Sequence, residues 1–325
     1  MCRHEASSRA VAEDVPVAAD VGWSEPAGTG PPQGWRATLP GGLLRTARPK
    51  QWMKNVLVFA APAAAGVLGQ ARPLARTVLV FVVFCLVASG TYFLNDCFDV
   101  SGDRCHPTKR FRPIAAGVVG VGLAEVVGTA LIASGLGLSV ALGWRTVVVV
   151  ASYLAVQALY TLWLKHEVIL DLAAVAAGFV LRAIAGGVAV GVPISEWFLI
   201  VAMFGSLFMV AGRRMSELRS VGDGQASSRA TLALYTAPFL RFILLMSSTV
   251  TVTAYCLWAF ESEKAVKGGI WFQLSIVPFT LALLRYAFLL DQGQGGSPED
   301  VVLGDRSLQV LAVLWMLIIG VGIYG

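Results

Sequence analysis

The sequence predicts an all-α, polytopic membrane protein with nine transmembrane helices. Two features of its composition support this prediction. Of the 325 residues, 56% are hydrophobic and only 14% are charged. That charged fraction is about half of what a soluble domain carries. The third observation is an alternation, from Val56 onward, between short polar loops and apolar runs near the roughly 20 residues that a spanning helix needs. A chain with so little charge cannot cover a water-facing surface, which excludes a soluble domain.

The first 42 residues differ in composition from the rest of the chain. They are rich in Gly, Pro, Ala and Ser and have no apolar periodicity. We therefore expect a disordered cytoplasmic tail over residues 1–42 and a transmembrane domain over residues 43–325. No signal peptide is expected, because no apolar core follows Arg3 or Arg9. The expected spans are 55–70, 75–94, 118–142, 146–163, 168–191, 196–212, 236–260, 270–290 and 307–324.

Basic residues in the loops indicate the orientation of the chain. With the N-terminus inside, the inner loops hold ten Lys and Arg residues and the outer loops hold five. An excess of basic residues marks the cytoplasmic side. We therefore expect a multi-pass protein of the cell (inner) membrane, with a cytoplasmic N-terminus and an outside C-terminus.

The polar residues gather in the inner loops, after the second, fourth, sixth and eighth expected spans. A transporter would place ionisable groups near the middle of the bilayer, on a path open to both sides. Here the middle of each span is almost free of charge. This distribution favours an enzyme that works at the cytoplasmic interface over a transporter or flippase.

The richest polar segment, NDCFDVSGDRCHPTKRFRPIAAG, follows the second expected span. If the helix continues to Asp103, the spacing of Asp96, Asp99 and Asp103 puts three carboxylates on one face, beside Asn95. Three ionised acids repel each other unless a cation lies among them. Oxygen ligands suit Mg²⁺, so we predict a magnesium site held by these three aspartates. The alternative is a solvated helix end paired with Arg104 and Lys109.

Three basic residues, Lys109, Arg110 and Arg112, follow these acids within ten residues. Acids followed by bases in one loop suit a metal-bound diphosphate, because arginine forks bind the oxygens that the metal leaves free. The alternative for each base alone is an anchor to anionic lipid.

A second polar group follows the fourth expected span. Lys165 can bind phosphate or reach the membrane surface as an anchor, and Asp171 can hold a second metal ion or orient a sugar hydroxyl. Arg182 lies about three helical turns beyond Asp171, on the same face. An Arg inside an apolar helix should face the protein interior, where a phosphate, an Asp partner or a structural ion pair would explain it.

Two further basic clusters should border the same inner pocket. Arg213, Arg214 and Glu217 close the sixth span, and Arg48, Lys50 and Lys54 open the first. We expect Lys50, Lys54, Arg213 and Arg214 to contribute to substrate binding. Arg285 and the acids Glu299, Asp300 and Asp305 receive no role from their spacing.

The order of Asn95, Asp96, Asp99 and Asp103 at the inner end of the second span resembles the first motif of the UbiA-type membrane prenyltransferase superfamily. The resemblance implies helices around a central cavity open to the cytoplasm and two acidic motifs that bind Mg²⁺-diphosphate. The second motif resembles Tyr160, Lys165 and Asp171. It departs from the usual Asp pair because position 167 is Glu, which weighs against a prenyl-diphosphate donor.

The segments RPKQWMKN, LKHEVILD, LRAIAGG, FGSLFMVAGRR, LRYAFLLD and PEDVVLGDR, taken with the acidic segment, resemble one branch, the actinobacterial decaprenyl-phosphate phosphoribosyltransferases. The resemblance runs from about residue 43 to the end. It implies transfer of 5-phosphoribosyl from 5-phosphoribosyl diphosphate to polyprenyl phosphate, at the start of the supply of lipid-linked arabinose for cell-wall arabinan. We expect Asp96, Asp99, Asp103 and Asp171 to be catalytic under this reading.

Two other functions compete with this one. An aromatic prenyltransferase of the same superfamily would use a lipid diphosphate donor and a ring acceptor. A structural membrane scaffold would not explain three acids on one helix face. No nucleic-acid partner is expected, and the sequence leaves open whether the chain forms a homo-oligomer.

The nine-span topology is tested by cysteine labelling. Cysteines substituted for Gly224 and Gly269 should react with a membrane-impermeant thiol reagent from opposite sides, with Gly224 inside, because one span separates them. Labelling of both positions from the same side would contradict the span count.

Overall fold

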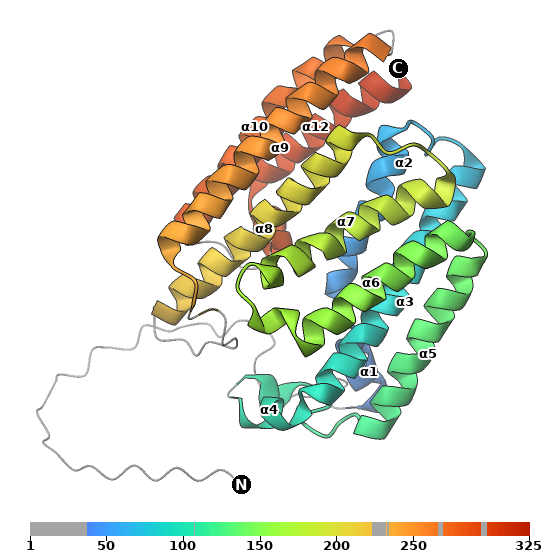
Figure 1. Ribbon diagram of the computed structural model, residues 1–325, viewed down its shortest axis with the longest axis vertical. Helices are drawn as coiled ribbons and strands as arrows, with labels where there is room; N and C mark the ends of the chain where they lie inside the picture. Colours follow the sequence, from blue (N-terminus) through green and yellow to red (C-terminus); the bar gives the residue numbers. More distant parts are fainter. Residues whose placement is uncertain (1–37, 107, 223–231, 233, 266–268, 294–297) are drawn as a thin grey trace, which may run out of the picture.

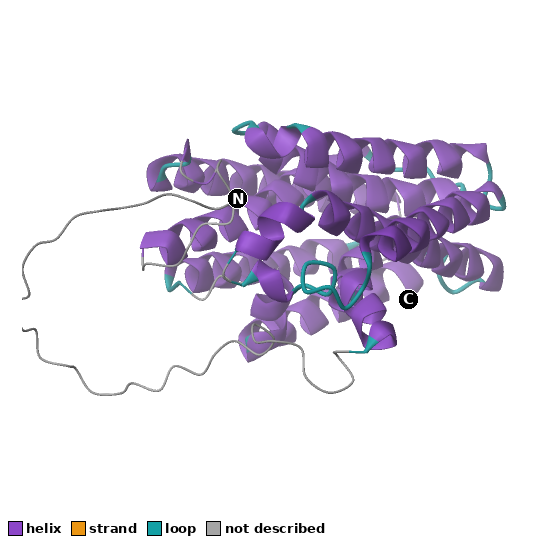
Figure 2. Cartoon of the chain, turned by 90° about the horizontal axis from the view of Figure 1, so that it is seen from below, coloured by secondary structure: helices purple, strands orange, loops and turns teal. Residues whose placement is uncertain are grey.

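The computed structural model describes residues 38–106, 108–222, 232, 234–265, 269–293 and 298–325, and every regular element in these ranges is helical. Most of the predicted tail lies outside the described residues. The first helix, α1 (Leu39–Ala47), already begins before residue 43, and the side chain of Thr38 accepts a hydrogen bond from the N–H of Gly41 as its N-cap. The helices stand side by side and form one elongated bundle (Figures 1 and 2).

Eight helices of the described part are long and apolar enough to cross a membrane. Their order confirms the all-helical fold, and their bounds differ from the expected spans by a few residues in most cases. The 118–142 run, although rich in glycine, is one unbroken helix. The eight are α3 (Ala71–Phe98), α5 (Val121–Val140), α6 (Trp144–Leu162), α7 (Leu170–Val190), α8 (Glu196–Gly222), α9 (Ala237–Ala265), α10 (Ile270–Asp291) and α12 (Arg306–Tyr324).

The first expected span is not a continuous α-helix, so the nine-helix prediction needs correction. It consists of the 3₁₀-helix η2 (Pro49–Phe59) and the short α2 (Ala60–Ala64). A 3₁₀-helix rises about 2.0 Å per residue and an α-helix about 1.5 Å, so these two elements together cover about 30 Å, the thickness of a bilayer core. The segment runs from the end of the bundle at which α1 lies to the end at which α2 lies (Figure 1).

Close packing against glycine fixes η2 inside the bundle. A Cβ atom built on Gly186 of α7 would lie 1.8 Å from the backbone oxygen of Val58 in η2. A Cβ on Gly90 of α3 would lie 2.6 Å from the backbone oxygen of Gly128 in α5. Small residues allow backbones to approach closely inside membranes, where dispersion forces rather than water exclusion drive helix association.

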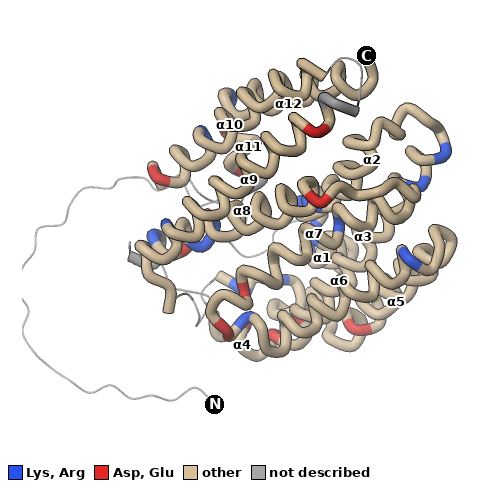
Figure 3. Tube along the Cα trace, turned by 45° about the horizontal axis from the view of Figure 1, so that its top comes forward, with Lys and Arg blue, Asp and Glu red and all other residues tan. Residues whose placement is uncertain are grey.

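One end of the bundle carries a cluster of charged residues, shown in Figure 3 around α4 (Val100–Cys105), the start of α7 and the end of α8. We call this the polar end. It consists of residues 48–50, 95–106, 108–120 and 160–171, the last turns of α8 and residues 234–236.

The contact between Gly186 and Val58 gives a stability prediction. Gly186→Ala should lower the stability of the purified protein by about 1–3 kcal/mol or more, because the added methyl group cannot fit against the η2 backbone. Gly137→Ala is the matched control, since nothing lies within 4 Å of its added Cβ in α5. That control should raise stability by up to about 1 kcal/mol. Thermal unfolding in detergent measures both, and equal unfolding temperatures for the two variants would contradict the close contact.

Candidate functional site

The acidic segment does not continue α3. That helix ends at Phe98, Asp99 has φ −88° and ψ 0°, and α4 then begins at Val100. The condition under which the three acids would share one helix face, a helix continuing to Asp103, is therefore not met. Asp96 and Asp103 are buried, whereas the side chain of Asp99 remains 36% exposed.

Arginines from two distant segments hold the buried acids. Arg48, at the end of α1, pairs with Asp96 at 2.7 Å, and its guanidinium lies 4.6 Å from the ring centroid of Tyr92. Arg112 pairs with Asp96 at 3.1 Å and with Asp103 at 2.7 Å. Burial raises the pKa of the Asp103 carboxyl, and Arg112 opposes that rise. Arg48 and Arg112 thus pair with the two buried acids.

Asp99 faces the opposite loop of the polar end. One carboxylate oxygen lies 3.5 Å from Nζ of Lys165, which sits in the 3₁₀-helix η4 (Leu164–His166). The other oxygen accepts a hydrogen bond from Nδ2 of Asn95 at 3.3 Å. The predicted first and second motifs therefore meet through these residues, which come from separate loops.

Within the described residues, no three His, Cys, Asp or Glu side chains form a metal-binding group. The donor chemistry nevertheless fits Mg²⁺. Asn95, Asp96, Asp99 and Asp103 offer only oxygen ligands that the ion prefers, and Asp99 is accessible. Magnesium in phosphate-transfer sites commonly uses one or two carboxylates and completes its shell with substrate phosphates and water.

A second cluster surrounds Asp171, which is fully buried at the start of α7. One of its carboxylate oxygens accepts a hydrogen bond from the hydroxyl of Tyr235, and the other accepts one from Nε of Arg214 at 3.0 Å. Glu217 accepts from both Arg214 (2.8 Å) and Arg213 (3.0 Å). Burial and the bond to Asp171 raise the pKa of Tyr235 well above its usual value, so its hydroxyl stays protonated and remains a donor.

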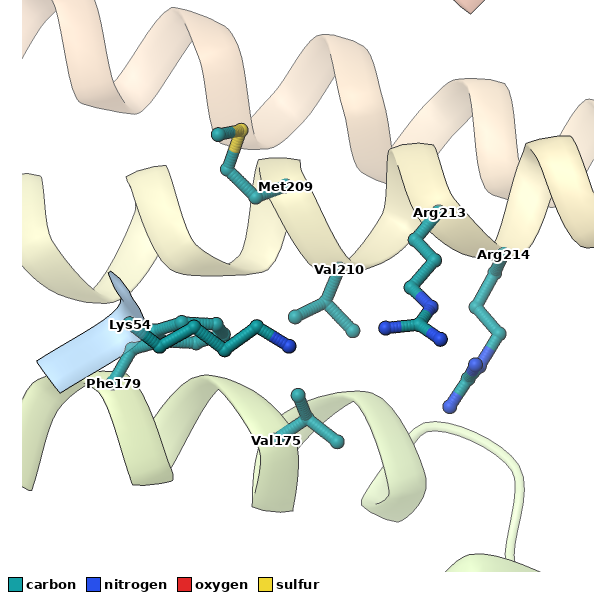
Figure 4. A pocket seen from close by; sticks show the side chains of 7 residues that line it. All are labelled: Lys54, Val175, Phe179, Met209, Val210, Arg213 and Arg214. Atoms are coloured by element: carbon teal, nitrogen blue, oxygen red, sulfur yellow. The ribbon is translucent and has the colours of Figure 1, made fainter. Parts of the chain in front are cut away.

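A pocket opens beside this cluster, between η2, α7 and α8. Its empty space, including the part open to solvent, is about 390 Å³. Figure 4 shows that the side chains of Lys54, Arg213 and Arg214 extend toward the same space. Four apolar side chains form the remaining wall, namely Val175, Phe179, Met209 and Val210. The described lining thus combines three cations with apolar surface.

Arg182 is buried in the bundle without a carboxylate among the partners that the structure describes. Its guanidinium donates to Oδ1 of Asn55 at 2.7 Å, to the backbone oxygen of Gly178 at 2.6 Å and to the hydroxyl of Tyr153 at 3.0 Å. Of the alternatives for Arg182, neither an Asp partner nor an ion pair is found among the described residues, where a neutral amide, a hydroxyl and a backbone oxygen accept its hydrogen bonds. Arg182 does not contact Asp171, which is bound to Arg214 instead.

The other predicted residues lie at the polar end with differing exposure. Lys50 on η2 and Arg110 on η3 (Lys109–Phe111) are exposed, and Arg110 lies 4.8 Å over the ring of Phe111. Lys109 is half-buried and interacts electrostatically with Asp103. Tyr160 is close enough to interact with Arg214.

Several residues of these clusters were not predicted from the sequence. Tyr235 and Asn55 are neutral side chains. Asn55 ends the segment RPKQWMKN, but nothing in that segment indicates Arg182 as its partner. Glu217 and Arg48 lie in the expected clusters. Glu217 pairs within α8 with Arg213 and Arg214, whereas Asp96, the partner of Arg48, is distant in sequence. Arg285 finds a partner in Asp305, at 2.7 Å.

Comparisons with known proteins agree with this fold. The UbiA prenyltransferase family model matches residues 56–320. The decaprenyl-phosphate phosphoribosyltransferase of Corynebacterium glutamicum is 47% identical over 291 residues, covering 88% of this chain and 88% of that protein. The protein of the same name from Mycolicibacterium smegmatis is 45% identical over 306 residues, covering 91% of this chain and 95% of that protein.

Solved structures share the architecture at lower identity. The structure of a UbiA homolog from Archaeoglobus fulgidus bound to GPP and Mg²⁺ superposes with a TM-score of 0.64, at 19% identity, and covers 86% of this chain and 98% of that one. With its eight membrane-length helices and a family match over most of its length, this multi-pass membrane protein belongs to the UbiA prenyltransferase family.

Proposed function

We propose that this protein transfers the 5-phosphoribosyl group from 5-phosphoribosyl diphosphate to decaprenyl phosphate and releases diphosphate. The observation that carries the proposal is 45% and 47% identity to decaprenyl-phosphate phosphoribosyltransferases over about nine-tenths of the chain. The product would supply lipid-linked arabinose for cell-wall arabinan.

The distribution of cations at the polar end supports this reaction. A prenyltransferase binds one strongly anionic group, the donor diphosphate. A phosphoribosyltransferase acting on a lipid phosphate binds three, because the donor also carries a 5-phosphate and the acceptor carries its own phosphate. Basic side chains occur in three places, beside the acidic segment, in η3 and around the pocket in Figure 4.

The acidic segment suits the diphosphate. Asn95, Asp96, Asp99 and Asp103 would hold Mg²⁺, and Arg48, Arg112 and Lys165 already lie within ion-pair distance of those carboxylates. When bound, Mg²⁺ supplies positive charge that stabilises the diphosphate as it leaves. The arginines can exchange a carboxylate for a phosphate partner, because their planar fork binds both with the same geometry.

The pocket between α7 and α8 suits the acceptor. Its apolar wall fits the hydrocarbon next to the lipid phosphate, and Lys54, Arg213 and Arg214 fit the phosphate itself. A phosphate monoester has a second pKa of about 6, so it is mostly a dianion at neutral pH and needs no strong general base. Its oxygen bonds to the anomeric carbon while the bond from that carbon to the diphosphate breaks. Direct displacement of this kind inverts the sugar and transfers no proton.

The polar end would face the cytoplasm, where the soluble sugar donor is available. The excess of Lys and Arg in the loops at that end supports this orientation.

The proposed reaction is tested with purified protein, labelled phosphoribosyl diphosphate, decaprenyl phosphate and Mg²⁺. Label should enter the lipid phase, and chelation of Mg²⁺ should stop it. Asp99→Asn should remain folded and lose about 10²-fold or more in turnover, because it removes the accessible charge from the metal site. Asp291→Asn, whose side chain is 75% exposed, is the matched control and should keep its activity.

Two results would contradict this proposal. One is near-normal turnover of Asp99→Asn at limiting Mg²⁺. The other is product only from a prenyl diphosphate and an aromatic acceptor, which would establish the competing prenyltransferase.

The loop that holds Lys109 and Arg110 gives a prediction about the donor 5-phosphate. Lys109→Gln or Arg110→Gln should raise the donor KM about tenfold or more and leave the acceptor KM nearly unchanged, because each removes one charge-assisted bond. Arg104→Gln is the matched control, since Arg104 is exposed nearby and donates to the backbone oxygen of Ala115. Equal rises in both KM values would identify the loop as a membrane anchor, and a rise for the lipid alone would reverse the subsites.

A further inference from the structure

The turn that precedes α7 is strained. Ile169 has φ 73° and ψ −47°, values that a β-branched side chain rarely adopts. Ile169 is 55% exposed, so burial of the residue does not account for the conformation. The turn lies between Lys165, which faces Asp99, and Asp171, which faces Arg214. It therefore sets the relative placement of the two halves of the site.

Tyr235 holds this turn through a hydrogen bond to its backbone. The N–H of Ile169 donates to the hydroxyl oxygen of Tyr235 at 2.9 Å. The Tyr235 side chain is buried, and its ring stacks on that of Phe239 with centroids 6.3 Å apart. A phenylalanine at this position would keep the packing and the stacking. The hydroxyl is needed only for its hydrogen bonds.

The same hydroxyl donates a hydrogen bond to Asp171. A tyrosine hydroxyl has one hydrogen to donate, so acceptance from Ile169 and donation to Asp171 together fix its orientation. Asp171 then accepts from Arg214 on its second oxygen, and Glu217 joins Arg214 to Arg213. A continuous chain of hydrogen bonds thus runs from the strained turn to two of the cations in Figure 4.

We infer that Tyr235 is a positioning residue that holds the Ile169 turn and, through Asp171, aims Arg213 and Arg214 into the pocket that binds the acceptor phosphate. The identity of that ligand rests on the proposed function. The positioning role itself rests on the hydrogen bonds of Tyr235, which belongs to the segment before α9 and does not line the pocket among the described residues.

The test compares two tyrosines that lie in or next to α9. Tyr235→Phe should raise the KM for decaprenyl phosphate about tenfold, as loss of one hydrogen bond to a charged group does, and leave the donor KM within about threefold of its wild-type value. Tyr255→Phe is the matched control, because the Tyr255 hydroxyl also makes two hydrogen bonds, to Ser275 and to Trp315, each at 2.7 Å. That control should lower the unfolding temperature to a similar extent and change neither KM.

A second variant isolates the turn. Glycine adopts positive φ without strain, so Ile169→Gly should have little effect alone and should recover about threefold or more of the acceptor KM in the Tyr235→Phe background. It also relieves the strain if Tyr235→Phe alone folds poorly. An unchanged acceptor KM in Tyr235→Phe, equal rises in both KM values, or no recovery by Ile169→Gly would overturn the inference.

Failure of the proposed function gives a different result. Wild-type protein would then incorporate no label from the sugar donor. Thermal stabilisation of the wild type, Tyr235→Phe and Tyr255→Phe by decaprenyl phosphate alone would still test the positioning role. A smaller stabilisation of Tyr235→Phe than of the other two supports the inference, and equal stabilisation overturns it.

Discussion

The burial of charge against an apolar bundle is the constraint on which the polar end depends. A carboxylate removed from water must find cationic or hydrogen-bonding partners. Removal of one partner from a buried ion pair costs more free energy than the intact pair contributes to stability. Asp171 meets this requirement through Arg214 and Tyr235, and Asp96 meets it through Arg48 and Arg112. Each pair joins segments far apart in the chain. The ion pairs therefore fix where the loops of the site lie relative to the helices.

The spans were predictable because membrane thickness fixes their length and lipid fixes their composition, as in α7 and α12. The 3₁₀ conformation of the first span was not predictable, because hydropathy does not distinguish a 3₁₀-helix from an α-helix. The contact between Val58 and Gly186 was not predictable either, because the two residues are far apart in sequence. The break at Asp99 was missed for a related reason. The i, i+3, i+7 spacing of the three aspartates also fits a continuous helix. The aspartates differ in their partners from other loops, Lys165 for Asp99 and Arg112 for Asp103, and the sequence does not reveal those partners.

Most charged residues of the candidate site could be predicted, because charge next to a membrane span is costly and so is a strong signal. Their pairing could not, since an ion pair such as that of Arg285 with Asp305 depends on tertiary geometry. Neutral partners gave still less signal. The hydroxyl of Tyr235 and the amide of Asn55 complete buried networks, yet the local sequence around each does not indicate its distant partner.

Arg182 has a consequence for how the middle of the bundle tolerates substitution. It lies twelve residues into α7, about 18 Å along the helix axis, where it is nearly enclosed and has neutral partners among the described side chains. A guanidinium removed from water depends on the acceptors around it, which here are Asn55 of η2, Gly178 of α7 and Tyr153 of α6. Loss of one acceptor would leave a buried charge short of a partner, so a single side chain ties these three elements to one arrangement.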